Sequence, residues 1–313
     1  MDNLVKLWKK PTASEIYMLA GWRQWADAGL ISSGLPRYLI NKTEAEKIGE
    51  IHPEGFYLFQ IPGTHHLFRP QVQLEEGHRK ALTTNDNEFY YTENNGKGLV
   101  IFLGEEPHLN GERYASAFFD AVEALGVQRV GIVGGVYGAM PYDKAREVSC
   151  VYSLPAMQQE FYRYAARFSD YEGGVTIGSY LASLAEARNI ELFVFYAFVP
   201  AYDFSQVSPV VSQISIEIDF RAWYELMRRF NHMFGMDIDL SELEIQSLNL
   251  TQSMDDELAE IEELAEGIDL DEYMDALNQG FQERPFVPLG DMWERGLRDI
   301  FDDAADDATN ENG

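Results

Sequence analysis

Four predicted loops carry the side chains best suited to chemistry in this sequence, and each loop follows a predicted buried strand. The loops comprise residues 21–27, 104–110, 134–142 and 199–204. In an open α/β sheet, ligands bind beyond the carboxyl ends of the strands, where neighbouring connections diverge. The candidate ligand-pocket residues are therefore Asp27, Glu105, Glu106, Asn110, Gly134, Gly135, Tyr137 and Tyr142, with Tyr202 and Asp203 on the fourth loop.

Glu105 and Glu106 are the strongest candidates for acid–base chemistry among these residues. Two adjacent carboxylates repel each other, which raises one pKa and suits one group to proton transfer. Successive residues in a loop usually point apart, however, so a structural interpretation stays open beside the catalytic one. In that interpretation one carboxylate caps the following helix and the other is solvated. A signal of two residues favours the structural interpretation.

The glycine-rich segments invite a comparison with phosphate-binding loops. Glycine lets backbone N–H groups approach an anion closely, and residues 134–138 read GGVYG. The segment lacks the Lys-Ser or Lys-Thr ending of a P-loop and the spacing of G-x-G-x-x-G. A tight turn at the end of a strand is the favoured interpretation. The second cluster, in residues 172–178, is likewise interpreted as a turn that passes close to the sheet.

The usual signatures of metal sites and of nucleophilic catalysis are absent from the sequence. His65, His66 and His78 do not form H-E-x-x-H or another metal-binding spacing. No G-x-S-x-G elbow is present. Cys150 has Val148 and Val151 as close neighbours, which predicts a small buried residue in a strand. We therefore expect no metal and no cofactor.

The elements that position the loops alternate between strands and helices along the first 235 residues, which predicts an α/β sheet with helices on its faces. Residues 48–91 differ, since short extended pieces such as 56–61 surround a Glu76-Gly77 turn that predicts a hairpin. Pro36 is expected to kink or restart a helix. Strands are predicted at 16–21, 99–103, 129–133 and 192–198, and helices at 30–40, 112–125, 153–168, 178–189 and 209–234.

Charge divides the chain near Gly235. The 313 residues are 46% hydrophobic with a net charge of −28. Residues 1–235 contribute −7 and residues 236–313 contribute −21. Apolar residues recur at helical spacing in much of the second part. The sequence predicts an α/β core domain (1–235), an acidic helical extension (236–300) and a disordered acidic tail (301–313).

Composition also restricts the partners and the compartment. The negative charge would repel a nucleic-acid backbone, so nucleic acid is not an expected partner. The single cysteine cannot form an intramolecular disulfide. No signal sequence or membrane-length apolar run is seen. We expect a cytoplasmic protein that does not bind membranes.

Several segments, in this order and spacing, make the sequence resemble the proteasome assembly chaperone 2 family. The resemblance covers roughly residues 16–235 and continues into D-L-S-E-L-E (239–244), the start of an acidic helical extension seen in many bacterial members. No single segment is diagnostic alone. The segments are G-W-R-Q-W-A-D-A-G (21–29), E-I-H-P-E-G-F-Y (50–57), Arg69-Pro70, E-E-P (105–107), G-V-Q-R-V-G (126–131), Y-E-G-G-V-T-I-G (171–178) and V-P-A-Y (199–202).

The resemblance implies a three-layer αβα sandwich with a mixed sheet like that of nucleoside phosphorylases. It also implies a non-catalytic protein-binding or assembly-chaperone role, with a protein partner or self-association into a homo-oligomer. The extension has no obvious counterpart in eukaryotic members. The ATP-grasp ligase label that some members carry has no support in these residues. A small-molecule-binding protein or enzyme that uses the strand-end loops stays open as the alternative.

Overall fold

The computed structural model describes residues 4–60, 69–83, 85–204, 213–264 and 270–288. Within these ranges, no helix is long and apolar enough to cross a membrane. The same residues contain no group of three or more His, Cys, Asp or Glu side chains placed to hold a metal ion. His65, His66 and the predicted tail at 301–313 lie outside the described residues.

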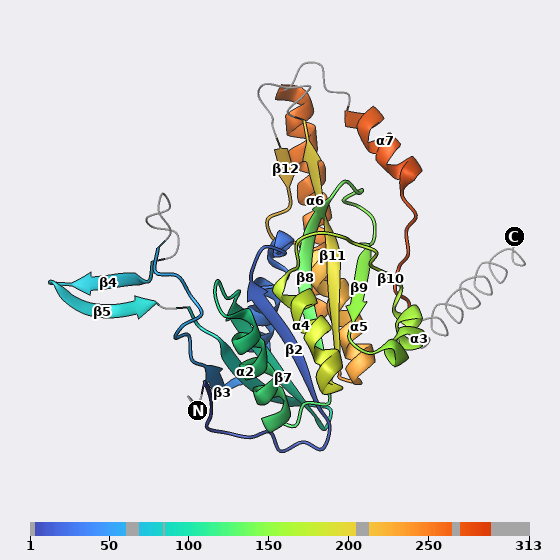
Figure 1. The fold of residues 1–313 in the computed structure, drawn as a ribbon. Helices are drawn as coiled ribbons and strands as arrows, with labels where there is room; N and C mark the ends of the chain where they lie inside the picture. Colours follow the sequence, from blue (N-terminus) through green and yellow to red (C-terminus); the bar gives the residue numbers. More distant parts are fainter. Residues whose placement is uncertain (1–3, 61–68, 84, 205–212, 265–269, 289–313) are drawn as a thin grey trace, which may run out of the picture.

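A mixed sheet of ten strands forms the centre of the molecule (Figure 1). Its order is β1-β3-β6-β7-β2-β8-β11-β9-β10, and β12 pairs with the end of β11. The four neighbours β7, β2, β8 and β11 run parallel, whereas β6 is antiparallel to β7 and β9 is antiparallel to β11. The strands are β1 (Val5–Leu7), β2 (Ile16–Arg23), β3 (Glu46–Ile51), β6 (Glu88–Asn94), β7 (Lys97–Glu105), β8 (Arg129–Gly138), β9 (Val148–Tyr152), β10 (Ala166–Phe168), β11 (Glu191–Asp203) and β12 (Gln213–Ser215).

Helices cover both faces of this sheet, which confirms the predicted α/β sandwich. Alternate residues of a strand point to opposite faces, so Phe193 and Phe195 of β11 enter one core and Val194 enters the other. Helices α1 (Gly34–Lys42) and α5 (Phe220–Phe234) share the first core, and α2 (Gly111–Ala124) and α4 (Ile177–Ala185) share the second.

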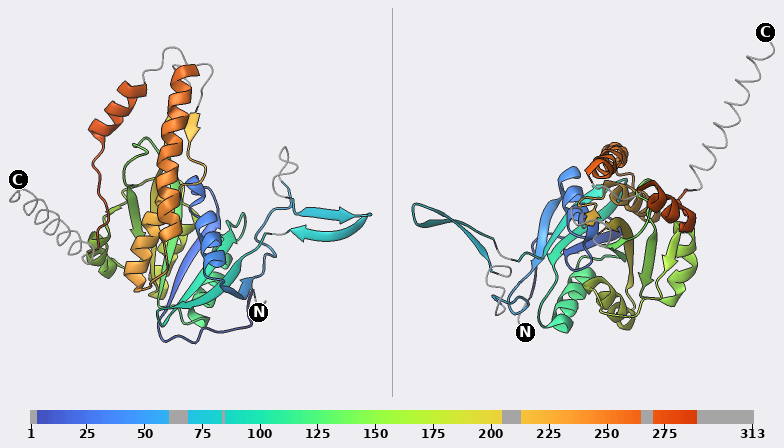
Figure 2. Two further views of the ribbon diagram at one scale, coloured as in Figure 1. Left: turned by 180° about the vertical axis from the view of Figure 1, so that it is seen from behind. Right: turned by 90° about the horizontal axis from the view of Figure 1, so that it is seen from above.

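The acidic extension folds back onto the same chain. Helix α6 (Ser241–Leu264) packs against α5, and Leu243, Met254 and Leu258 are buried in the core that contains Phe230 of α5. Helix α7 (Leu270–Gly280) adds Tyr273, which contacts the Phe204 ring near the end of β11. Figure 2 shows α6 along the back of the sandwich. The helices therefore dock, through their apolar side chains, on their own core.

A buried ion pair fixes the start of α5. The Arg146 Nε and the Asp219 Oδ2 are 2.7 Å apart, and only 1% and 0% of the two side chains are exposed. Asp219 also accepts a hydrogen bond from the Ala222 N–H, so it caps the helix. The Arg146 guanidinium donates further bonds to the carbonyl oxygens of Tyr142 and Lys144. The buried charges are thus paired and hydrogen-bonded, as burial requires.

The predicted hairpin is confirmed and stands apart from the sheet. Strands β4 (Gln71–Glu75) and β5 (His78–Thr83) are antiparallel. Glu76 and Gly77, with φ of 50° and 83°, form the turn between them. Two consecutive residues with positive φ are typical of the turns that match strand twist. Figure 1 shows this hairpin projecting sideways from the molecule.

Several predicted elements differ from the structure. The helix predicted over 153–168 is interrupted: only short helical turns, including α3 (Gln158–Phe161), form before Ala165 takes φ 51° and β10 begins. Ser153, at the start of the predicted helix, donates its hydroxyl to the Ile190 carbonyl. In the described part of 209–234, the helix begins only at Phe220, after β12. Residues 56–60 form no strand. The expected restart near Pro36 is present, since α1 begins at Gly34 and Pro36 lies in its first turn, where proline fits a helix.

Leu243→Ala tests the docking of α6. Leu243 is fully buried in the shared core, so its truncation should lower the free energy of unfolding by about 2–5 kcal/mol. Urea denaturation followed by tryptophan fluorescence measures this change. The control Leu109→Ala alters a side chain that is 43% exposed and should change stability by less than about 0.5 kcal/mol. Equal effects of the two substitutions would contradict the docking.

Candidate functional site

The loop after β2 lies against β8, which brings two of the predicted site residues together. Asp27 and Gly135 form an isolated parallel bridge, and the Gly135 N–H donates to the Ala26 carbonyl at 2.9 Å. Because β2, β7, β8 and β11 are parallel, their carboxyl ends share one edge of the sheet. The strand-end loops therefore meet there, as the sequence predicts.

Asp27 is engaged with the backbone that leads into α1. Its Oδ1 accepts hydrogen bonds from the Ser32 and Ser33 N–H groups at 2.8 and 2.9 Å. Its Oδ2 accepts a bond from the Ser33 hydroxyl at 2.6 Å. Burial raises the pKa of the Asp27 carboxyl, and these hydrogen bonds oppose the rise. All three bonds shape the turn before α1, so they give Asp27 a structural task.

Gly134 and Gly135 lie inside β8 and not in a turn beyond it, because the strand continues to Gly138. A Cβ at Gly135 would lie 2.0 Å from the Ala28 carbonyl oxygen, and one at Gly134 would lie 2.6 Å from the Tyr196 ring. Real Cβ atoms do not approach other atoms that closely. The predicted strand end at residue 133 is therefore wrong. The two glycines leave room for the loop after β2 and for the Tyr196 ring. The Gly135 N–H already donates to the Ala26 carbonyl.

Glu105 and Glu106 point to different partners. Glu105 forms an ion pair with Arg23 at 3.0 Å, and burial raises its pKa while Arg23 lowers it. The Glu106 carboxylate accepts bonds from the Trp25 N–H at 3.2 Å and the Ile177 N–H at 3.1 Å. Glu106 thus adds to the cap of α4, whose N-cap residue is Thr176, and does not cap α2, the helix that follows it in the sequence. The two carboxylates are not arranged as an acid–base pair.

The remaining candidate residues are dispersed. Asn110 precedes α2 with φ 55°, and its amide donates to the Gly55 carbonyl at 2.7 Å. The Tyr137 ring is 50% exposed on β8. The Tyr142 hydroxyl donates to Asp255 of α6. The Tyr202 hydroxyl, buried beneath, donates to the Met140 carbonyl at 2.9 Å. Tyr142 therefore serves the contact with α6.

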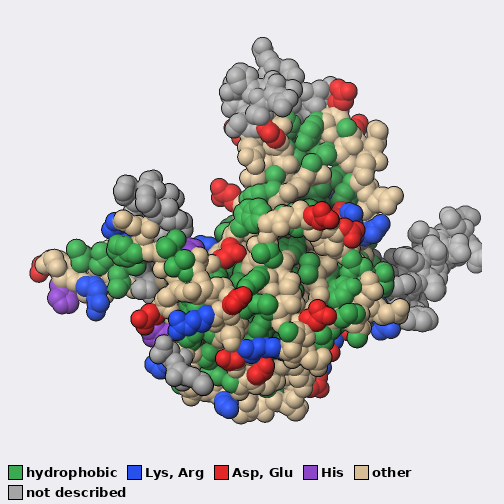
Figure 3. All heavy atoms as spheres, in the orientation of Figure 1, with side chains coloured by type: hydrophobic (Ala, Val, Ile, Leu, Met, Phe, Trp, Pro, Cys, Tyr) green, Lys and Arg blue, Asp and Glu red, His purple; other side chains and the backbone are tan. Residues whose placement is uncertain are grey.

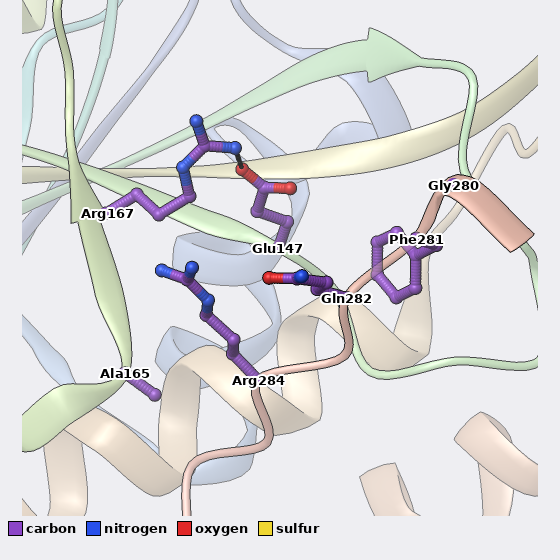
Figure 4. A pocket seen from close by; sticks show the side chains of 7 residues that line it. All are labelled: Glu147, Ala165, Arg167, Gly280, Phe281, Gln282 and Arg284. Carbon is purple, nitrogen blue, oxygen red and sulfur yellow. Dashed lines mark hydrogen bonds and ion pairs between the residues drawn. The ribbon is translucent and has the colours of Figure 1, made fainter.

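Two cavities in the described residues lie elsewhere, and none of the eight candidate residues lines either. One, of about 290 Å³, lies where the segment after α7 crosses β10. Figure 4 shows Gln282 and Arg284 of that segment beside the ion pair between Arg167 and Glu147. The other, of about 250 Å³, lies between α5 and α6 beside Leu248 and Phe286.

A group of exposed apolar side chains near the strand ends was missed by the sequence-based prediction. Trp25 is 71% exposed, Tyr171 is 67% exposed and Val175 is 57% exposed. The Trp25 indole lies over the backbone at Gly174, where a Cβ would be 3.4 Å from the ring. We call these three residues the Trp25 patch. Two features of the sequence could have indicated this patch. Trp25 follows the end of a strand among polar residues, and Tyr171 begins a Tyr-Glu-Gly-Gly segment.

The fold and the site define a class of protein: a three-layer α/β sandwich whose strand-end carboxylates bind its own backbone and side chains, and whose adjacent surface exposes aromatic rings. Residues 22–258 match the model of the PAC2 family. The chain therefore belongs to the PAC2 family, and the resemblance seen in the sequence is confirmed.

Solved structures share this fold at low sequence identity. A PAC2 family protein from Streptomyces avermitilis is 24% identical, with a TM-score of 0.65 over 77% of this chain and 95% of that one. A proteasome-assembly chaperone homologue from Mycobacterium tuberculosis is 22% identical, with a TM-score of 0.66 over 82% and 99%. PbaB of Pyrococcus furiosus, an archaeal proteasome activator, is 16% identical, with a TM-score of 0.56 over 82% and 98%. No curated protein sequence matches the chain significantly.

Asp27→Asn tests the buried carboxyl. Because burial raises the pKa of Asp27 in the folded state above its unfolded value, the folded protein binds the proton more tightly. The stability of the wild type relative to the Asn variant should therefore rise as pH falls through that raised pKa. Urea midpoints of both proteins at about pH 7 and about pH 4 measure the change. The prediction would be contradicted if the stability of the wild type relative to the Asn variant stayed constant with pH, or decreased as pH falls.

Gly135→Ala tests the close approach of the loop to β8. The new methyl group would collide with the Ala28 carbonyl, and we expect a loss of about 1–3 kcal/mol or more in the free energy of unfolding. Gly111→Ala, at the start of α2, is the control. A Cβ at Gly111 would make an ordinary 3.5 Å contact with the Tyr180 ring. The control should be neutral or slightly stabilising. A Gly135→Ala variant as stable as the control would refute the close approach.

Proposed function

We propose that this PAC2 family member is a non-catalytic, assembly-chaperone-like protein that binds other proteins in the cytoplasm and associates with itself. The observation that carries the proposal is the Trp25 patch. Three large apolar side chains, Trp25, Tyr171 and Val175, are more than half exposed. Trp25 follows β2, at the edge of the sheet where α/β proteins bind ligands. The nearby carboxylates of Asp27 and Glu106 are occupied by the protein's own backbone.

The physical character of the patch suits a protein partner. Tryptophan and tyrosine are enriched among the residues that dominate binding energy at protein interfaces. The backbone at Trp25 is held by the bond from its N–H to Glu106, which also caps α4. A backbone that is already held in place loses little conformational entropy on binding, so more of the contact energy contributes to affinity.

The partner that we propose is a proteasome-type subunit or a related ring-forming protein. The support comes from family membership and from structural neighbours that are described as a proteasome-assembly chaperone homologue and a proteasome activator. An assembly chaperone requires an exposed surface that binds other proteins, and it requires no catalytic site. The Trp25 patch meets that requirement, because the carboxylates near it are hydrogen-bonded to the protein's own backbone.

The double substitution Trp25→Ala with Tyr171→Ser tests this role. The full-length chain, tagged and purified, is mixed with proteasome α-type subunits from the same organism, and binding is measured by surface plasmon resonance. Loss of two aromatic anchors should weaken binding at least about 30-fold. Tyr162→Ala is the control, since this ring is 65% exposed but belongs to the helical turns before β10.

Undiminished binding by the double variant would contradict a role for the patch, and no binding by the wild type would contradict the proposed partner. Binding of a metabolite that is abolished by Glu105→Gln with Glu106→Gln would favour a small-molecule function instead.

A further inference from the structure

The β4–β5 hairpin, which we call the arm (residues 71–83), exposes an apolar face. Val72 is 54% exposed, Leu74 is 58% exposed and Leu82 is 48% exposed. Val72 pairs directly with Leu82, and Leu74 lies two residues from Val72, so the three side chains share one face. Figure 3 shows hydrophobic side chains along the arm, with acidic, basic and histidine side chains near its outer end. A two-stranded sheet gains stability only when such a face is covered.

The arm is neutral within a strongly acidic protein. Residues 71–83 contain two basic and two acidic residues in a chain of net charge −28, and Lys80 forms an ion pair with Glu75 at 3.4 Å. Arg79 pairs in register with Leu74, at the end of the apolar face near the turn. The surface that covers the arm should therefore combine apolar side chains with acidic ones at one end.

Helix α6 of the same chain has a surface of this kind. It contains eight acidic residues and no Lys or Arg. Ile245 and Leu248 are 59% and 69% exposed, on the side of the helix away from buried Met254. Helical spacing places Gln252 and Asp256 on the same line, where the Gln252 amide donates to Asp256. We call Ile245, Leu248, Gln252 and Asp256 the α6 stripe.

The two surfaces also match in length. Ile245 and Asp256 are eleven residues apart, which spans about 16 Å along a helix. The first and last residues of β4 are four residues apart, which spans about 14 Å along a strand. Val72, Leu74 and Leu82 can therefore lie along Ile245 and Leu248 while Arg79 reaches Asp256.

We propose that the arm of one copy of this chain docks on the α6 stripe of a second copy. Figures 1 and 2 show the arm extending sideways, away from α6 of its own chain, so the two surfaces meet between copies. The contact joins unlike surfaces, and such head-to-tail contacts close into rings or continue as filaments. This inference rests on the self-association within the proposed function and names its surfaces.

Complementation between two variants tests the contact. Val72→Ser with Leu74→Ser removes the arm face, and Ile245→Ser with Leu248→Ser removes the stripe. All four side chains are exposed, so each variant should keep the circular dichroism spectrum of the wild type. Sedimentation velocity should show an oligomeric wild type and at least about tenfold weaker association for each variant. An equimolar mixture should form a 1:1 dimer, because one copy retains the stripe and the other retains the arm.

The control and the opposing results separate this proposal from the proposed function. Gln71→Ala with Gln73→Ala alters the other face of β4 and should leave the mass unchanged. An oligomer that survives either apolar variant, or two monomeric variants that form no dimer when mixed, overturns the docking while self-association stands. A wild type that is monomeric at every concentration overturns both. Trp25→Ala should not change the mass, so a failure of partner binding is distinguishable.

Discussion

The ion pair between Arg146 and Asp219 is the interaction on which much of the structure depends. Asp219 caps α5, and its N–H donates to the Gly29 carbonyl in the loop after β2. Arg146 brings the segment between β8 and β9 to the same point, and its backbone N–H donates to Glu225 of α5. The loop, the sheet and α5 thus meet at one buried charge pair. Loss of either partner would leave an uncompensated buried charge, which typically costs about 3–5 kcal/mol.

This arrangement has consequences for the strand ends and for the extension. α5 supports α6 through the core that contains Phe230 and Leu243. The loop that reaches Asp219 also packs on Gly135 of β8, through Ala28. The groups that look reactive in the sequence are therefore part of the scaffold that joins the layers. Their task is to satisfy buried backbone groups, which would otherwise be costly.

The surfaces left over from this scaffold explain why a protein-binding role suits the molecule. The Trp25 patch lies where a rigid scaffold holds it, and rigid aromatic residues make effective anchors. The arm and the α6 stripe pair apolar side chains with opposite charges in a protein whose overall charge resists association. Local complementarity of this kind selects one contact out of many that the net charge disfavours.

Features that depend on near neighbours in the chain follow from the amino-acid sequence. Strand and helix periodicity identified the central strands, and Glu76 and Gly77 identified the hairpin turn. The charge balance predicted an acidic helical extension, and α6 and α7 are helices. Errors arose where local preference met a distant constraint. The predicted helix over 153–168 ended early because Ala165 turns the chain so that residues 166–168 can pair with β9.

The roles of the candidate site residues depend on contacts between distant segments. Glu106 caps a helix that begins seventy-one residues later, at Ile177. Trp22 is fully buried, where its indole N–H donates to the Tyr114 hydroxyl, while Trp25 three residues on is exposed. Both outcomes follow from which surfaces the sheet and helices bring together. Local sequence carries propensity and spacing, whereas burial and hydrogen-bond partners come from contacts between distant segments.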